Sequence, residues 1–135
     1  MKKIPTDLKI LNEIYKRYFA FYESHTPDNP NRSTKNYVPI EISKIAECLK
    51  AEGNIVFGRL YYHLEKKYGY TNEDGTKVPL FALNFADGEM HCVNFPYMAS
   101  VLAELREENK KFKLATSIAV LSIIISIISL FIAAS

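Results

Sequence analysis

Four basic side chains follow one another at helical spacing in the middle of the chain: Arg59, His63, Lys66 and Lys67. Positions i, i+4, i+7 and i+8 share one face of a helix. Such a face can enter the major groove of DNA, where an arginine contacts base edges and lysines contact phosphates. The same four residues are equally compatible with the solvent-exposed side of an ordinary amphipathic helix. Glu65 lies on this helix as well.

Metal ligation and catalysis find less support in the residue pattern. The soft metal ligands of the sequence are His25, His63, His91, Cys48 and Cys92. They form no Cys-x-x-Cys or His-x3-His pair, so a zinc ion would have to collect them from separate elements. A glycine-rich phosphate loop and a Cys-His nucleophile are also lacking. We therefore predict no metal site, no cofactor and no enzymatic activity, with Cys92 in the core.

The elements that would position the basic face begin with an amphipathic helix. Its apolar residues recur at helical spacing from Leu8 to Tyr22, and Asp7 is a plausible N-cap. The polar stretch Ser24–Tyr37 holds two prolines and predicts a long loop that is either mobile or functional.

A helix-turn-helix is expected next. Apolar residues predict a second helix over about Ile40–Lys50, ended by Gly53. A third helix is predicted over about Asn54–Tyr68, with a stripe formed by Val56, Leu60 and Leu64. Two helices joined by a tight turn that contains glycine have the spacing of this motif.

The periodicity then changes to that of strands. Val78–Phe85 and Met90–Phe95 are expected to pair through a turn centred on Asp87 and Gly88, because both central positions favour positive φ. This turn would place Leu83 opposite Cys92 and Ala82 opposite Val93. The residues expected on the core face are Phe81, Leu83, Phe85, Met90 and Cys92.

The charge distribution separates the end of the sequence from the rest. All 17 Lys+Arg and all 15 Asp+Glu precede Leu114. Residues Leu114–Ala134 would span about 31 Å as a helix, which matches the hydrocarbon core of a bilayer. A buried core helix is the alternative, and it would need a larger domain around it. We predict a transmembrane helix that continues a helix beginning at Pro96.

The flanking charges predict an orientation. Lys110, Lys111 and Lys113 precede the apolar run, which places residues 1–113 in the cytoplasm by the positive-inside rule. The first residues lack a signal-peptide core. We expect a tail-anchored, single-pass protein in the lipid bilayer, with its two cysteines reduced.

Small residues recur within the apolar run at spacings of 4, 3, 4, 3 and 4: Ala115, Ala119, Ser122, Ser126, Ser129 and Ala133. Small residues let membrane helices approach closely, so this seam predicts a homodimer. The alternative is that alanine and serine are simply common in spanning helices. The same spacing continues back to Met98, Val101 and Leu105, which either extend the seam or cover the domain's own core.

The order of predicted elements from Asp7 to about Arg106 resembles that of the winged-helix domain, the winged variant of helix-turn-helix. The resemblance implies an α+β fold in which Asn54–Tyr68 is the recognition helix and the hairpin around Asp87 and Gly88 is the wing. We expect a winged-helix-like domain over residues 1–95, a connecting helix over 96–113 and a transmembrane helix over 114–134.

Regional charge leaves several functions open. Residues 1–70 hold 12 cationic and 8 acidic side chains, whereas residues 71–95 hold one cationic and four acidic ones. A wing that contacts phosphates should be basic, and this one is acidic. The first hypothesis is a membrane-tethered DNA-binding regulator that uses the four basic side chains on double-stranded DNA. The second is an adaptor that recruits a cytoplasmic protein through Tyr62, Tyr70 or the loop Thr26–Tyr37. The third is a small membrane-active effector.

Overall fold

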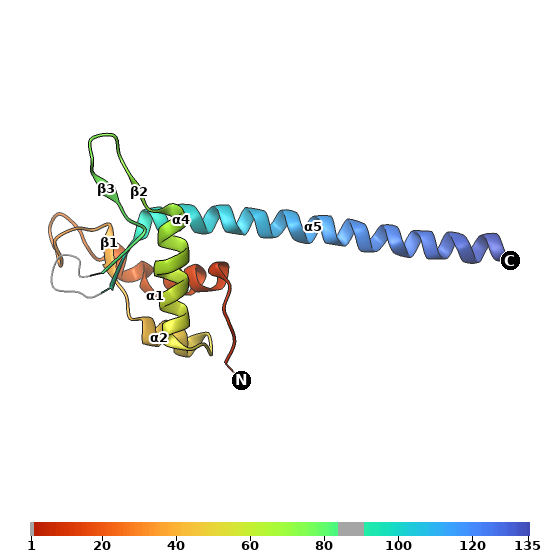
Figure 1. The fold of residues 1–135 in the computed structure, drawn as a ribbon, viewed down its shortest axis with the longest axis horizontal. Coiled ribbons are helices and arrows are strands. Elements are labelled where there is room, and N and C mark those ends of the chain that lie inside the picture. The colour runs from red at the N-terminus through yellow and green to blue at the C-terminus, as the bar shows by residue number, and fades with distance from the viewer. Residues whose placement is uncertain (1, 84–90) are drawn as a thin grey trace. The chain divides into compact units, whose positions relative to one another are not determined.

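The computed structural model describes residues 2–83 and 91–135 and has an α+β fold (Figure 1). The chain divides into two compact units, Met1–Leu102 and Ala103–Ser135. The first unit contains helices and a small antiparallel sheet, and the second is helical. The predicted turn at Asp87 and Gly88 and the predicted core positions Phe85 and Met90 lie outside the described residues.

Helix α1 (Asp7–Glu23) begins where the sequence predicts, but its N-cap is Thr6 rather than Asp7. The hydroxyl of Thr6 accepts a hydrogen bond from the backbone N–H of Lys9 at 3.2 Å. A threonine hydroxyl at this position satisfies one of the free amides of the first turn. The carboxylate of Asp7 is therefore available for other contacts. Leu11 and Ile14 of the predicted apolar face are buried, and Ile10, which was not predicted, is buried with them.

The long polar segment after α1 is held by Arg32. Its guanidinium donates hydrogen bonds to the backbone oxygens of Phe21, Tyr22 and Lys35 at 2.9–3.1 Å. The last carbonyls of a helix have no partner within the helix, and the guanidinium supplies donors to them. The segment ends in strand β1 (Tyr37–Pro39), which the sequence analysis missed because three residues that include a proline give almost no strand signal.

Helix α2 (Ile42–Cys48) ends earlier than predicted, and Gly53 does not end it. Lys50 instead adopts the positive φ of 53° that reverses the chain. Gly53 is the first residue of the next helix, and the carboxylate of Glu52 accepts a hydrogen bond from the N–H of Ile55 at 3.1 Å. The N-cap at Glu52 thus decides that Gly53 starts a helix.

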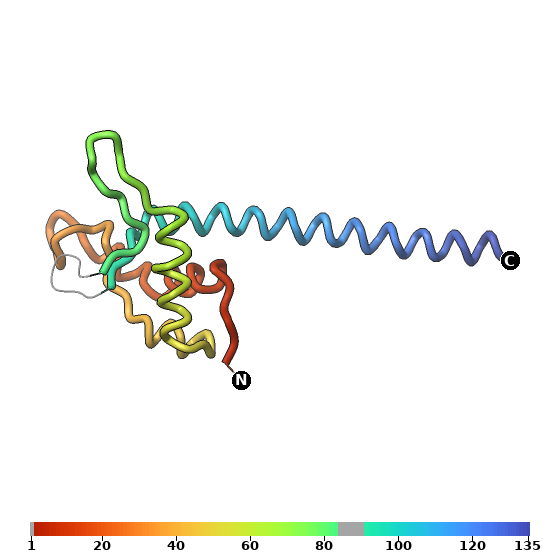
Figure 2. Tube along the Cα trace, viewed as in Figure 1, coloured from red at the N-terminus to blue at the C-terminus, as the bar shows by residue number. Residues whose placement is uncertain are grey.

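The predicted third helix is continuous but not uniform. It consists of α3 (Gly53–Gly58), the π-helical segment η1 (Arg59–Glu65) and α4 (Lys66–Tyr68). Figure 2 shows these three segments as one continuous helix. The predicted stripe is confirmed, because Val56, Leu60 and Leu64 are all fully buried.

Strands β4 (Phe81–Leu83) and β5 (His91–Asn94) pair one residue away from the predicted register. Leu83 lies opposite His91, and Ala82 lies opposite Cys92. Strand β5 is central in the order β1-β5-β4, so Cys92 and Val93 are both buried although they point to opposite faces. Burial of Phe81 opposite Val93 favours this register over the predicted one, and Leu83 is 38% exposed rather than in the core.

A second hairpin follows α4 and was not predicted. Strands β2 (Tyr70–Thr71) and β3 (Lys77–Val78) pair through a turn in which Gly75 has a φ of 88°. Figure 1 shows this hairpin projecting from the helices and sheet of the first unit. The continuous strand predicted over Val78–Phe85 is interrupted after β3, where Pro79 cannot donate a ladder hydrogen bond.

Helix α5 (Phe95–Ala134) runs without a break, as predicted. Met98, Val101 and Leu102 are buried, so the first unit extends to Leu102 rather than to residue 95. The core therefore uses Met98 and Val101, two of the positions that could have continued the small-residue seam. With a mean hydropathy of 2.7 in its most apolar window, α5 is long and apolar enough to cross a membrane.

Candidate functional site

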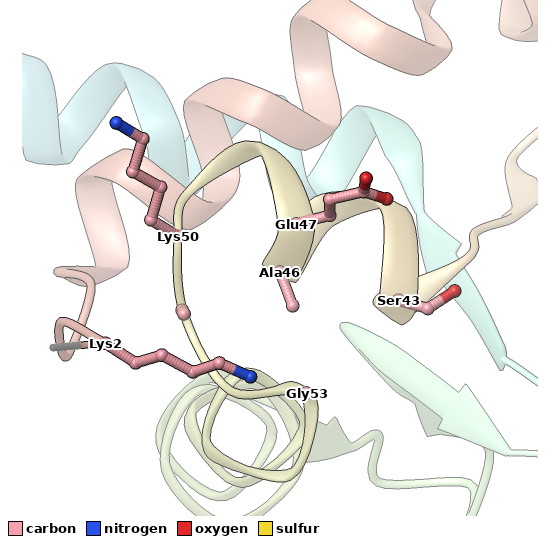
Figure 3. A pocket seen from close by; sticks show the side chains of 7 residues that line it. Lys2, Ser43, Ala46, Glu47, Lys50 and Gly53 are labelled. Atoms are coloured by element: carbon pink, nitrogen blue, oxygen red, sulfur yellow. The ribbon is translucent and has the colours of Figure 1, made fainter.

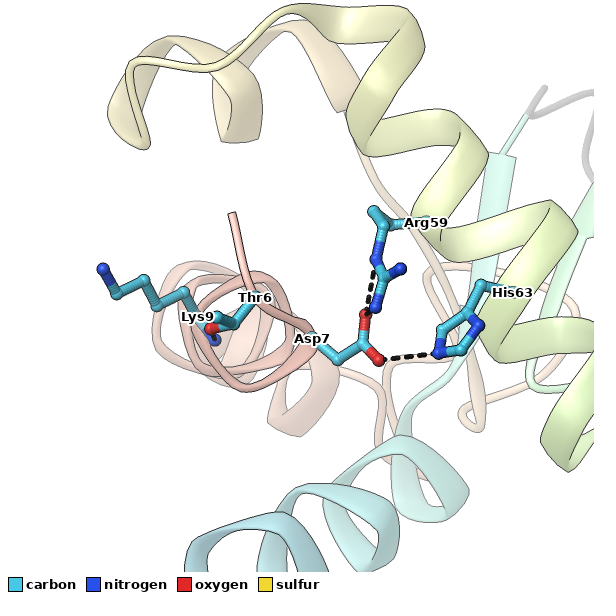
Figure 4. Close-up of polar contacts among 5 residues, drawn as sticks. All are labelled: Thr6, Asp7, Lys9, Arg59 and His63. Carbon is cyan, nitrogen blue, oxygen red and sulfur yellow. Dashed lines mark hydrogen bonds and ion pairs between the residues drawn. The ribbon is translucent and has the colours of Figure 1, made fainter. Parts of the chain in front are cut away.

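An acidic residue from α1, Asp7, contacts two of the four basic residues predicted on the third helix (Figure 4). Arg59 donates hydrogen bonds from Nε and Nη2 to Oδ1 of Asp7, at 2.9 and 2.6 Å. His63 places Nε2 at 3.0 Å from Oδ2 of the same carboxylate. Asp7 is free to do this because Thr6 supplies the cap of α1. Each carboxylate oxygen of Asp7 thus contacts one of two among the four residues that were predicted to bind DNA.

The two lysines of the predicted face lie elsewhere. Lys66 lines an open groove beside β4, and Nζ of Lys67 lies 5.2 Å from the centre of the Tyr68 ring. Arg59 and His63 thus contact Asp7, whereas Lys66 and Lys67 have other neighbours. The sequence could have indicated the Asp7 contact only by pairing Asp7 with Arg59 across 52 positions.

Glu65, which the sequence analysis placed among these cations, turns toward the sheet instead. Its Oε2 accepts hydrogen bonds from the backbone N–H groups of Leu80 and Phe81 at 2.7 and 2.8 Å. These two amides lie at the start of β4, so Glu65 joins η1 to the edge of the sheet. The carboxylate is consequently not paired with Lys66 or Lys67.

An open groove of about 500 Å³, which we call the tyrosine groove, lies between the helix and the edge strand β4. Its lining includes Tyr61, Tyr62 and Lys66 from the helix and Phe81, Ala82 and Leu83 from the strand. Tyr62 is 70% exposed and Tyr61 is 39% exposed. Exposed aromatic side chains at a concave surface are typical of protein interaction sites.

Aromatic packing supports the wall of the tyrosine groove. The ring of Phe57 stacks on Tyr61 with centroids 5.5 Å apart, and it meets Tyr62 edge-on at 6.1 Å. His91 stacks on Phe81 at 5.8 Å. Burial lowers the pKa of the His91 imidazole, because the charged form would lose hydration among these rings. His91 is therefore predominantly neutral near pH 7.

A second open hollow, of about 620 Å³, lies beside the turn between α2 and α3. Lys2, Ser43, Glu47 and Lys50 contribute to its lining (Figure 3). Lys2 extends toward Gly53, whereas the ammonium group of Lys50 points away, so the two cations do not converge on one ligand. This hollow lacks the arrangement of an anion-binding site.

In the second unit, every seam residue from Ala115 to Ala133 is exposed. The hydroxyls of Ser122, Ser126 and Ser129 each donate to the carbonyl four residues earlier, at 2.9–3.0 Å. The serine hydroxyls thereby donate within their own helix, and only small side chains remain on this side of α5. Lys110, Lys111 and Lys113 are exposed just before the apolar run.

Metal ligands do not cluster in residues 2–83 and 91–135, which contain no group of three or more His, Cys, Asp or Glu suited to an ion. Cys48 is exposed, and Cys92 is buried as predicted. Comparison with known proteins adds no assignment, since no family model, no curated protein and no solved structure matches this chain.

Proposed function

We propose that this protein is a single-pass membrane protein whose first unit binds a partner protein through the tyrosine groove. In this proposal α5 crosses the bilayer, and Lys110, Lys111 and Lys113 keep the first unit on the cytoplasmic side. The protein would act as an adaptor that holds its partner at the membrane. It would do so without catalysis.

The observation that carries this proposal is the contact of Asp7 with two of the four basic residues. Arg59 and His63 both contact this carboxylate, so a DNA phosphate would compete with an anion that is already in place. Tyr61 and Tyr62, in contrast, remain exposed beside Leu83 at the tyrosine groove. Aromatic residues that are only partly buried contribute strongly when a partner covers them.

The edge strand adds a second reason to favour a protein partner. Strand β4 lies at one end of the order β1-β5-β4 and borders the tyrosine groove. A segment of the partner could pair with such an edge while its side chains contact Tyr61 and Tyr62. Glu65 already occupies the N–H of Phe81, so pairing would begin beyond that residue.

The small-residue seam supports a homodimer as part of the proposal. Its serines donate within their own helix, which leaves a surface that a second copy of α5 could approach closely. Two copies would present two tyrosine grooves to the partner and so increase the apparent affinity.

DNA binding by a winged-helix-like first unit is the second candidate, and one observation favours it. Because Glu65 turns to β4, it does not offset the charge of Lys66 and Lys67. These two lysines could contact phosphates even while Arg59 stays paired with Asp7. The regulator would then be held at the membrane by α5.

Photo-crosslinking of the full-length protein tests the adaptor proposal. A benzoyl-phenylalanine in place of Tyr62 should form a covalent adduct with one protein partner, and nuclease treatment should not remove it. The matched control places the same group at Tyr70, which is also exposed but lies on β2. Equal adducts from both positions, or none from Tyr62, would contradict the proposal.

DNA binding has its own test on the same detergent-solubilised protein. The K66Q/K67Q variant should lose retention on double-stranded DNA at low salt if the second candidate is correct. Wild-type protein that shows no salt-dependent retention would exclude that candidate and leave the adaptor proposal unaffected.

A further inference from the structure

Helix residues 103–113 carry their charges on two different faces. At about 100° per residue, one face holds Glu104, Glu107, Glu108 and Lys111. A second face, within an arc of about 60°, holds Arg106, Lys110 and Lys113, and we call it the basic row. These charged side chains are all exposed.

The first face carries three carboxylates and one cation, whereas the second carries three cations and no carboxylate. Lys111 follows Glu107 by four residues and Glu108 by three, which are the spacings at which opposite charges attract along a helix. Neighbours in the basic row carry the same charge at these spacings and repel each other, and Lys110 also follows Glu107 by three residues. Within residues 2–83 and 91–135, neither Lys110 nor Lys113 forms an ion pair with a carboxylate. Lys110 and Lys113 therefore favour an external anion.

The distance of the basic row from the apolar run indicates which anion its side chains can contact. With a rise of about 1.5 Å per residue, Lys113 and Lys110 lie about 1.5 and 6 Å before Leu114, where the uncharged run begins. The headgroup layer of a bilayer is about 5–8 Å thick on each side. Both lysines would therefore lie within this layer.

We propose that the basic row binds the phosphate groups of anionic phospholipids and gathers these lipids around α5. This inference rests on the proposed membrane span. A zwitterionic headgroup brings its own cation, so its phosphate offsets less of the charge of the row. An anionic headgroup brings net negative charge, which basic residues beside a spanning helix attract. The partner is thus a lipid class rather than a free phosphate.

Tryptophan fluorescence in reconstituted vesicles tests this inference directly, because the natural sequence contains no Trp. Phe112→Trp places a reporter at the depth of the two lysines of the basic row, and Ile124→Trp places one in the middle of the apolar run. Each full-length variant is reconstituted with mixed phosphatidylcholine and phosphatidylglycerol, of which one or the other is brominated. Bromine quenches only through the lipid that carries it, so free phosphate gives no signal.

We expect the Phe112→Trp reporter to be quenched more strongly by brominated phosphatidylglycerol, with a relative association constant of roughly fivefold over phosphatidylcholine. Equal quenching of this reporter by the two lipids would overturn the inference, even if both lipids quench the Ile124→Trp reporter. If neither lipid quenches the Ile124→Trp reporter, the membrane span itself fails, and with it the proposed function.

Variants in the Phe112→Trp background assign the preference to the row. K110Q/K113Q should reduce the relative association constant to about one, because it removes two of the three cations. Lys111→Gln is the matched control from the same helical turn, and it should retain most of the preference because Lys111 lies on the acidic face. Loss of preference in K111Q equal to that in K110Q/K113Q would overturn the role of the row.

Discussion

Arg59 donates two hydrogen bonds to a single carboxylate oxygen of Asp7, from Nε at 2.9 Å and from Nη2 at 2.6 Å. The pair joins the first residue of α1 to the first residue of η1, across 52 positions of sequence. Its side chains are 34% and 16% exposed. This contact joins the third helix to the first and pairs Arg59, one of the residues predicted to contact DNA, with a carboxylate.

Replacement of Arg59 by alanine should lower the free energy of unfolding by about 1–2 kcal/mol. The change leaves the largely buried Asp7 carboxylate with His63 as its remaining partner. Urea denaturation of the detergent-solubilised protein, followed by near-ultraviolet circular dichroism of the tyrosines, measures the loss. This signal reports the first unit, because residues 103–135 contain no tyrosine.

Lys44→Ala is the matched control for that experiment. It breaks the Lys44–Glu41 ion pair, in which the side chains are 56% and 59% exposed. Water screens such a pair, so the loss should stay below about 0.5 kcal/mol. Similar losses in the two variants would show that the Asp7 contact contributes no more than an ordinary surface pair.

Removal of the Glu65 carboxylate should lower the free energy of unfolding more than removal of the Arg59 guanidinium does. Glu65→Ala leaves the N–H groups of Leu80 and Phe81 without their acceptor, and we expect a loss of about 2–4 kcal/mol. Glu65→Gln keeps one oxygen acceptor and should lose less. The same urea titration compares the two, and a Glu65→Ala protein as stable as the wild type would refute the role of Glu65 in joining η1 to β4.

Acidification should destabilise the first unit through His91. Burial lowers the pKa of this imidazole in the folded state below its unfolded value. The unfolded chain therefore binds the proton more readily, so stability is highest above about pH 6.5 and falls as the pH drops through the lowered folded pKa. His91→Phe keeps the stacking on Phe81 and should flatten the dependence between about pH 7 and 5. The urea midpoint measured against pH checks this, and identical slopes for both proteins would contradict it.

Enlarging the seam should weaken self-association of α5. The variant A119L/S122L/S126L prevents close approach of two helices, and a bilayer reporter assay should record roughly tenfold weaker dimerisation. The control V120L/I124L/I128L changes three residues on the opposite side of the helix and should leave dimerisation unchanged. Equal effects of the two variants would leave the seam with no role in association.

Local patterns predicted much of this fold correctly. The buried stripe Val56, Leu60 and Leu64, the start of α1 and the unbroken helix α5 all follow from periodicity or composition within one segment. Each depends on side chains a few residues apart along the chain, so the sequence contains the necessary information. The apolar run after Lys113 is likewise a property of composition alone.

The candidate site depended on contacts between distant segments. The short strand β1, the register of β4 on β5 and the pairing of Asp7 with Arg59 each join residues that no local pattern relates. The sequence by itself determined which helices exist and which of their faces are apolar, because these follow from spacing. Only the tertiary structure decided which polar groups remain at the surface, because an ion such as Arg59 is satisfied by whatever carboxylate the packing brings within hydrogen-bond distance.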